Sequence, residues 1–236
     1  MKNKFKIKIY ADGADMNSII KLNKSKLING FTTNPSLMRK SGVKNYKNFC
    51  KLLLKKVKKK PISFEVFSDE LSLMRSQALE IASWGKNVFV KIPIINSKNI
   101  NTSELIKELS NKGINVNVTA IFSINQIKKL IYNYKPKSKI ILSVFAGRIA
   151  DTGVDPENII KKINSSIKYK KNVSVLWASS REIFNLHQAQ RSNCKIITLS
   201  HDLISKLQYH NKNLEEFSRE TVVQFNLDAK KSKFKL

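Results

Sequence analysis

The sequence is poor in the residues on which metal sites and disulfide frameworks depend. Among its 236 residues there are two cysteines, Cys50 and Cys194, and neither belongs to a Cys-x-x-Cys pair or a Cys/His cluster. The three histidines, His187, His201 and His210, are not spaced as metal ligands. We therefore expect no structural or catalytic metal, no cofactor and no disulfide framework, and a reduced cytoplasmic protein is the simplest interpretation.

Long apolar runs are also lacking. No run approaches the roughly 18 residues that a membrane-spanning helix needs, so we expect no membrane as a partner. Residues 1–6 carry charge with no apolar segment behind them, which is not the pattern of a secretory signal. The 42% of hydrophobic residues can still bury a large core, and the length falls within the range of single-domain α/β barrels.

Acidic residues are scarce, with 17 against 44 lysines and arginines, and the formal net charge is +27. Such an excess suggests a polyanionic partner. However, only six of the basic residues are arginines, and the lysines are scattered over nearly every predicted helix, as in a general compositional bias. We expect nucleic acid not to be the partner, and a catalytically inactive barrel that binds polyanions remains a remote alternative.

Short β-rich runs alternate with helical patterns along the chain. The β-rich runs are 6–12, 27–34, 62–67, 88–93, 115–121, 140–147, 173–179 and 195–200. The helical patterns are 16–24, 45–59, 71–84, 103–111, 123–132, 156–169, 180–190 and 202–208. This alternation predicts parallel βαβ units, and eight units without a linker predict a single closed (β/α)8 TIM barrel.

A further helical pattern at 214–229 and a basic tail follow the eighth unit. We take residues 1–236 as one barrel domain in which 210–236 form a C-terminal helix and tail. This helix has no strand to serve, so it either closes the barrel or docks on a neighbouring subunit. We expect a homo-oligomer.

A charged residue interrupts the apolar run Val88–Pro93. Lys91 shares one face of this predicted strand with Phe89, because side chains alternate between the two faces. A lysine among apolar neighbours has its charged form disfavoured, which makes a neutral, nucleophilic amine accessible. Such amines form Schiff bases with carbonyl compounds. Taken alone, however, Lys91 is better explained as a strand-end lysine that extends to water.

Polar residues recur on the predicted inner faces of other strands. The outer face of a helix-covered parallel strand is apolar, so Asp12, Glu65, Asn117, Thr119 and Ser143 should point into the barrel. Each of them alone is better explained as a satisfied buried polar group. Together with the strand-four lysine they predict a site at the C-terminal ends of the strands, where barrels carry their chemistry.

The chemical roles follow from the residue types. An amine nucleophile needs groups that move protons, and the carboxylates of Asp12 and Glu65 suit this task. Asn34, Asn117 and Ser143 suit substrate hydroxyls, and Thr119 suits a water molecule.

Two of the scarce arginines follow predicted strands. Arg148 comes after strand six, and Arg181 follows Ser179-Ser180 at the predicted start of helix 180–190. A cation in the first turn of a helix opposes the helix dipole unless an anion binds there, which favours a phosphate site. A surface pair of Arg181 with Glu182 or Asp151 explains the residue equally well.

Four segments resemble motifs of the transaldolase family, which includes short transaldolases and fructose-6-phosphate aldolases. They are Thr32-Thr33-Asn34-Pro35-Ser36-Leu37, Val90-Lys91-Ile92-Pro93, Asn115-Val116-Asn117-Val118-Thr119 and Phe145-Ala146-Gly147-Arg148-Ile149. The resemblance runs in order from about Ile9 to Leu207. It implies a (β/α)8 barrel whose strand-four lysine forms the Schiff base.

The resemblance also implies a role for each matched residue. Lys91 would be the nucleophile, Asp12 would take the proton of the C4 hydroxyl, and Glu65 with Thr119 would handle the catalytic water. The implied substrate-binding residues are Thr33, Asn34, Asn117, Ser143 and Phe145. The implied phosphate-binding residues are Arg148, Ser179 and Arg181.

The expected function is transfer of a dihydroxyacetone unit from a ketose phosphate to an aldose phosphate, as in the pentose phosphate pathway. Within the family, Glu65 and Phe145 favour transfer, whereas fructose-6-phosphate aldolases tend to have Gln and Tyr there. Cleavage that releases free dihydroxyacetone is the alternative. Gly13, Asp15 and Val144 depart from the family pattern, which leaves the exact sugar phosphate open.

Overall fold

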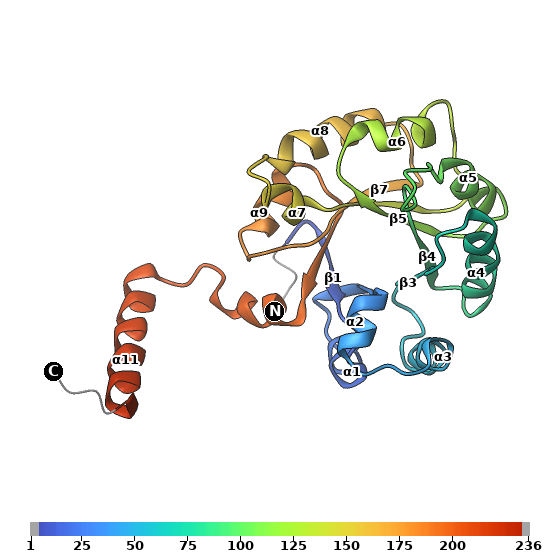
Figure 1. The fold of residues 1–236 in the computed structure, drawn as a ribbon. Coiled ribbons are helices and arrows are strands. Elements are labelled where there is room, and N and C mark those ends of the chain that lie inside the picture. Colours follow the sequence, from blue (N-terminus) through green and yellow to red (C-terminus); the bar gives the residue numbers. More distant parts are fainter. Residues whose placement is uncertain (1–4, 233–236) are drawn as a thin grey trace. The chain divides into compact units, whose positions relative to one another are not determined.

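Eight parallel strands form a closed barrel in the computed structural model, which describes residues 5–232 (Figure 1). Each strand pairs with the next, and β8 pairs with β1. The strands are β1 (Lys8–Asp12), β2 (Ile28–Thr32), β3 (Ile62–Glu65), β4 (Val88–Pro93), β5 (Val116–Ile121), β6 (Ile140–Val144), β7 (Val173–Trp177) and β8 (Ile196–Ser200). The predicted (β/α)8 barrel is confirmed.

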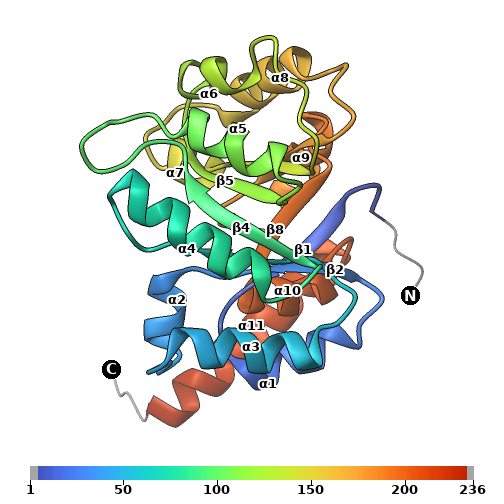
Figure 2. The same cartoon turned by 90° about the vertical axis from the view of Figure 1, so that its right-hand side faces the viewer.

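Helices cover the outside of the barrel, as Figure 1 and the rotated view of Figure 2 show for α4 and α5 beside β4 and β5. The helices of the barrel are α1 (Met16–Asn23), α2 (Pro35–Lys40), α3 (Tyr46–Lys56), α4 (Leu71–Ser83), α5 (Ser103–Asn111), α6 (Ile124–Ile131), α7 (Ala146–Ala150), α8 (Pro156–Ser166), α9 (Asn185–Arg191) and α10 (His201–Lys206). Residues of α4, α5 and α8 bury apolar side chains against the strands, as amphipathic helices do.

Two short helices were not predicted: α2 directly follows the run 27–34 expected to form a strand, and α7 begins within the run 140–147 expected to form another. Strand β2 ends at Thr32, and the Oδ1 atom of Asn34 caps α2 by accepting a hydrogen bond from the Leu37 amide at 2.9 Å. Pro35 occupies the first helical position, where its missing N–H costs nothing. Strand β6 ends at Val144, and Phe145 precedes α7 rather than lying on the strand.

An apolar plug fills the middle of the barrel. It consists of Tyr10, Phe89, Ile141, Leu176, Ala178 and Ile196, all of them inward-facing residues. Gly30 of β2 makes room for it, because a Cβ atom there would lie 2.6 Å from the Tyr10 ring. Leu176 and Ala178 line a cavity at one mouth of the barrel, whereas Tyr10 and Phe89 line a cavity at the other. The plug therefore separates the two mouths.

The contacts divide the chain into two compact units, 1–204 and 205–236. The second unit holds a 3-10 turn, η1 (Leu207–Tyr209), and the helix α11 (Leu214–Ser232), as the sequence predicted from position 214. The Tyr209 and Phe217 rings stack with centroids 5.3 Å apart, and none of the described α11 side chains is buried. The last residues of the predicted basic tail, 233–236, lie outside the described residues.

Cys50 and Cys194 are both buried and form no disulfide. Within residues 5–232, no helix combines the length and the apolar character that crossing a bilayer requires.

Candidate active site

A cavity of about 570 Å³ opens where the C-terminal ends of the strands meet. Ten of the twelve residues that the sequence singled out line it. They are Asp12, Asn34, Glu65, Lys91, Thr119, Ser143, Phe145, Arg148, Ser179 and Arg181. The barrel thus brings together side chains from β1, β3, β4, β5 and β6 and from the segments that follow β2, β6 and β7.

Lys91 lies in the middle of this group and is only 7% exposed. Its Nζ atom is 3.0 Å from Oε2 of Glu65, which lies opposite it in the register of β3 and β4. The same Nζ donates a hydrogen bond of 3.2 Å to the backbone carbonyl of Thr33. A lysine held in this way does not extend to bulk water, so the simpler explanation of Lys91 is wrong.

Asp12 is the second carboxylate of the cavity, and its environment differs from that of Glu65. Its Oδ1 atom accepts a hydrogen bond of 2.7 Å from the hydroxyl of Thr32, which also lies 2.7 Å from the hydroxyl of Thr198. Burial raises the pKa of Asp12 because it disfavours the charged form, whereas the positive charge of Lys91 and the Thr32 hydrogen bond act in the opposite direction. Glu65 is therefore ion-paired, whereas Asp12 is enclosed by the barrel wall. Two carboxylates in different environments are suited to different proton-transfer roles.

A bulge at the end of β5 places Thr119. Between Val118 and Ile121 the strand advances three residues while β6 advances two, and Ala120 adopts a left-handed backbone with φ of 56°. The Oγ1 atom of Thr119 is buried, and it has no hydrogen-bond partner among the described residues. A buried hydroxyl without a hydrogen-bond partner lowers the stability of the fold unless a water molecule or a ligand supplies that partner.

Two of the predicted residues do not line the cavity. The amide of Asn117 donates to the Ser63 hydroxyl at 3.0 Å and accepts from the Ser143 hydroxyl at 2.6 Å, so it lies behind Ser143 and fixes that side chain. The Thr33 hydroxyl donates to the Ser63 carbonyl at 2.9 Å, and only the Thr33 backbone carbonyl meets Lys91. Both side chains are fully buried and form their hydrogen bonds with other residues of the barrel wall.

A close backbone contact joins the segments that carry the arginines. Gly147 of α7 donates its N–H to the Ala178 carbonyl at 3.3 Å, and a Cβ atom at this position would lie 1.6 Å from the Ser179 carbonyl oxygen. Only glycine permits this approach. Ser179 itself adopts a left-handed backbone with φ of 62°. The segments that carry Arg148 and Arg181 are therefore in direct contact, and both arginines line the cavity.

The predicted position of Arg181 in the first turn of a helix is wrong. Helix α9 begins at Asn185, whose Oδ1 atom accepts hydrogen bonds from the amides of Arg181 and Glu182 and so holds the preceding segment outside the helix. The guanidinium of Arg181 forms an ion pair with Asp151, which holds the pKa of that carboxyl below its usual range. The alternative of a surface pair is therefore realised, and Arg181 lines the cavity as well.

The sequence did not single out four polar residues that line the cavity, Thr32, Ser36, Lys40 and Thr198. Thr198 stands on β8 between Ile196 and Ser200, and the alternation that identified Thr119 could have identified it. Lys40 ends α2, so finding it required the Asn34-Pro35 helix start to be recognised.

The fold and the cavity define a (β/α)8-barrel protein with a buried lysine and two carboxylates at the C-terminal mouth. The family model described as Transaldolase/Fructose-6-phosphate aldolase matches residues 9–236, and the chain belongs to this family of enzymes.

Proteins of similar sequence agree with this assignment, and a solved structure of low sequence identity shares the fold. The chain is 33% identical over 206 residues to a "Probable transaldolase" of Nitrosopumilus maritimus, with 86% of this chain and 88% of that protein covered. It is 34% identical over 210 residues to a "Probable transaldolase" of Sulfurihydrogenibium sp., with 86% and 90% covered. The solved structure of dihydrodipicolinate synthase from Rhodopseudomonas palustris shares the fold at 11% identity, with a TM-score of 0.57 over 94% of this chain and 79% of that one.

Proposed function

We propose that the protein is a class I, Schiff-base transaldolase that moves a dihydroxyacetone unit from a ketose phosphate to an aldose phosphate. The observation that carries the proposal is the buried Lys91 amine, 3.0 Å from the Glu65 carboxylate, in one cavity with Asp12. The family membership supports the reaction class. Each residue of this site has a side chain that is chemically able to fill the role proposed for it.

The first steps form the covalent bond. The Lys91 amine, having passed its proton to the neighbouring Glu65 carboxylate, attacks the C2 carbonyl carbon of the ketose phosphate. The resulting carbinolamine loses its hydroxyl as water when that hydroxyl receives a proton, which leaves the Schiff base. The unpaired Thr119 hydroxyl is suited to hold this water and the one that later hydrolyses the product.

The next steps break and remake a carbon–carbon bond. The Asp12 carboxylate takes the proton of the C4 hydroxyl, the C3–C4 bond breaks, and its electron pair moves toward the Schiff-base nitrogen. An aldose phosphate leaves and a three-carbon enamine stays on Lys91. The enamine then attacks the carbonyl carbon of the acceptor aldose phosphate, and Asp12 returns the proton. The raised pKa of Asp12 suits a group that both takes and returns a proton.

The substrate is held at two ends in this proposal. Two side chains are suited to bind the hydroxyls of the three-carbon unit. One is Ser143, which Asn117 holds in place, and the other is Asn34, whose Oδ1 atom caps α2 and whose Nδ2 atom can still donate a hydrogen bond. Arg148, Ser179 and Arg181 are suited to the phosphate, since guanidinium groups bind phosphate oxygens with charge-assisted hydrogen bonds. Arg181 also pairs with Asp151.

Transfer rather than simple cleavage is favoured by Glu65 and by Phe145. The Phe145 ring centroid lies 5.7 Å from that of Phe122 and 5.3 Å from the Arg148 guanidinium. Steady-state turnover of fructose 6-phosphate with and without an aldose phosphate acceptor tests this. A transaldolase turns over only with the acceptor. Equal turnover without it, with release of dihydroxyacetone, would assign the fructose-6-phosphate aldolase reaction instead.

We also propose a cytoplasmic homo-oligomer that acts on sugar phosphates in the pentose phosphate pathway. The exposed apolar side chains of α11, among them Leu214, Val222 and Phe225, support assembly, since exposed groups of this kind mark interaction surfaces. Sedimentation equilibrium of the full chain beside a chain that ends at residue 210 measures the oligomer and the contribution of α11. The remote alternative, an inactive barrel that binds polyanions, requires that no ketose phosphate be turned over.

A further inference from the structure

The mouth of the barrel opposite the active site is lined by lysines. All eight strands are parallel, so their first residues meet at this N-terminal mouth, where a cavity of about 750 Å³ opens. Six lysines line it, Lys8, Lys58, Lys59, Lys86, Lys139 and Lys171. The floor is the lower side of the apolar plug, formed by Tyr10, Phe89, Ile141 and Ile196.

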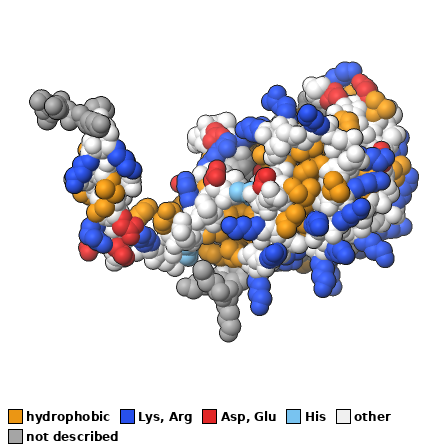
Figure 3. Space-filling model, turned by 90° about the horizontal axis from the view of Figure 1, so that it is seen from below, with side chains coloured by type: hydrophobic (Ala, Val, Ile, Leu, Met, Phe, Trp, Pro, Cys, Tyr) orange, Lys and Arg blue, Asp and Glu red, His pale blue; other side chains and the backbone are white. Residues whose placement is uncertain are grey.

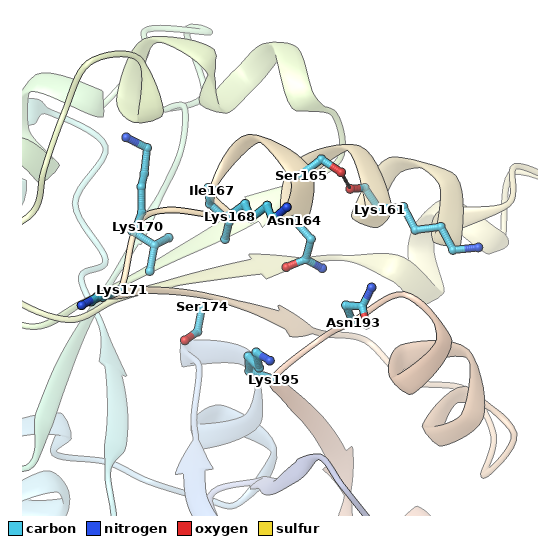
Figure 4. Close-up of a pocket in the computed structure, with 11 residues that line it drawn as sticks. Lys161, Asn164, Ser165, Ile167, Lys168, Lys170, Lys171, Ser174, Asn193 and Lys195 are labelled. Atoms are coloured by element: carbon cyan, nitrogen blue, oxygen red, sulfur yellow. Dashed lines mark hydrogen bonds between the residues drawn. The ribbon is translucent and has the colours of Figure 1, made fainter.

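Two further cavities continue from this mouth across the surface. One of about 610 Å³ shares Lys171 and Ser174 with the first and adds Lys168 and Lys195. Figure 4 shows its lining side chains coming from the end of α8, from the turn before β7 and from the starts of β7 and β8. The other cavity, of about 680 Å³, shares Lys170 and reaches the outer end of α6. We call the three together the basic track.

The number of lysines alone does not define a site, because Figure 3 shows Lys and Arg side chains scattered over the whole face that it presents. What distinguishes the track is the scarcity of counter-charge. Among the described residues that line the three cavities there is no aspartate or glutamate. Of the described lysines that line them, Lys129 and Lys161 lie 3.9 and 3.7 Å from glutamates outside the lining, and the others form no ion pair. Like charges around concave, low-dielectric walls reinforce one another's field, which attracts anions.

The scattered lysines of the sequence did not lead us to expect a nucleic-acid partner, but because the structure gathers twelve of them along connected cavities, we propose that the basic track binds single-stranded nucleic acid through its phosphate backbone. The extended, continuous shape of the track fits a chain of phosphates better than a compact anion. No arginine is among the described lining residues of the three cavities, and lysines bind phosphates as point charges without reading base edges. The binding is therefore independent of base sequence.

Exposed aromatic rings on and beside the track favour a single strand over a duplex or a phosphate polymer. Tyr132 is 75% exposed and lines the outer cavity beside Lys128 and Lys129. Tyr169 is 88% exposed and, without lining a cavity itself, lies in the chain between Lys168 and Lys170, two residues of the middle cavity. Unpaired bases stack on exposed aromatic side chains, whereas bases inside a duplex are not available to do so.

A matched pair of quadruple variants tests the proposal by fluorescence anisotropy with a labelled oligouridylate over a range of salt concentrations. The track variant changes Lys139, Lys168, Lys171 and Lys195 to Gln. The control variant changes Lys21, Lys44, Lys51 and Lys55 to Gln; all four are exposed, and none lines any of the three cavities. Both variants lose the same formal charge, and an unchanged melting temperature shows that each is folded.

We expect the wild-type protein to bind with a steep salt dependence. In the track variant the slope of log K against log salt falls by about 0.7 for each lysine that contacts phosphate, whereas the control keeps the wild-type slope. Equal losses in the two variants, or no binding at low salt, would overturn the proposal.

The rings provide a second test of what binds. Replacing both Tyr132 and Tyr169 by Ala should weaken oligouridylate binding on the order of 30-fold or more, because each stacked base contributes about 1–3 kcal/mol. Binding of inorganic polyphosphate should be unchanged. If duplex DNA or polyphosphate competes as well as the oligouridylate and the rings have no effect, the single-strand assignment is wrong. None of these readouts depends on transaldolase turnover, so this proposal and the proposed activity fail separately.

Discussion

The ion pair between Lys91 and Glu65 allows a quantitative test of how the active site is held together. At the Nζ–Oε2 distance of 3.0 Å, Coulomb's law with an effective dielectric constant of about 20 gives an attraction of about 5–6 kcal/mol. The side chains are only 9% and 19% exposed, so much of this attraction offsets their lost hydration. Removing one partner leaves the other charge buried and unpaired, which typically costs about 3–5 kcal/mol.

We expect Lys91→Met to lower the free energy of unfolding at pH 7 by about 3 kcal/mol, the lower end of this range, because Glu65 faces a cavity that water can enter. Glu65→Gln should cost a similar amount. The double variant should recover most of the loss, since replacing both members of a buried pair is often close to neutral. With single losses of about 3 kcal/mol each and a double-variant loss of about 1 kcal/mol, the coupling energy measured by urea unfolding of all four proteins should be about 5 kcal/mol in magnitude.

The cycle contains its own control, because each single variant leaves one charge unpaired whereas the double variant leaves none. Additive losses in the double variant would refute the account of the pair as mutually dependent buried charges.

Three further variants test the remaining parts of the site. Asp12→Asn should abolish transfer but raise the free energy of unfolding at pH 7, because burial disfavours the charged carboxylate and raises the pKa of Asp12. This gain in stability should vanish as the pH falls toward 3.8, the ordinary pKa of the group, and urea unfolding over a range of pH values measures it. Arg148→Met should raise KM for the ketose phosphate by roughly 10-fold or more and leave KM for an unphosphorylated ketose unchanged, since a hydrogen bond to a charged group contributes about 1.5–3 kcal/mol. Gly147→Ala should displace α7 from the Ser179 carbonyl and raise the same KM, whereas Ala150→Gly on the same helix should cost only about 1 kcal/mol of stability. A Gly147→Ala enzyme with wild-type KM would contradict the close-contact argument.

Much of the barrel could be predicted because its physics is local and periodic. Each strand is a short apolar run with alternating faces, and one buried face admits only one register. The same alternation predicted the inward direction of Asp12, Glu65, Lys91 and Ser143, which the cavity lining confirms.

The parts that could not be predicted depend on contacts between distant segments. Asn117 and Thr33 have the inward or strand-end position expected of site residues, but which neighbour takes their hydrogen bonds is decided by Ser63 on another strand. Arg181 lies outside a helix because Asn185 accepts from the preceding amides, a local hydrogen bond that periodicity does not encode. The five-residue α7 is too short to leave a periodic signal.

The central claim is that the Lys91 amine forms the covalent bond to substrate. Incubation with fructose 6-phosphate and borohydride, followed by peptide mass mapping, tests it directly, because borohydride reduces a Schiff base to a stable amine. The account predicts a single three-carbon adduct on the peptide that contains Lys91, and no adduct in Lys91→Met. An adduct on another lysine, or transfer activity that survives in Lys91→Met, would contradict it.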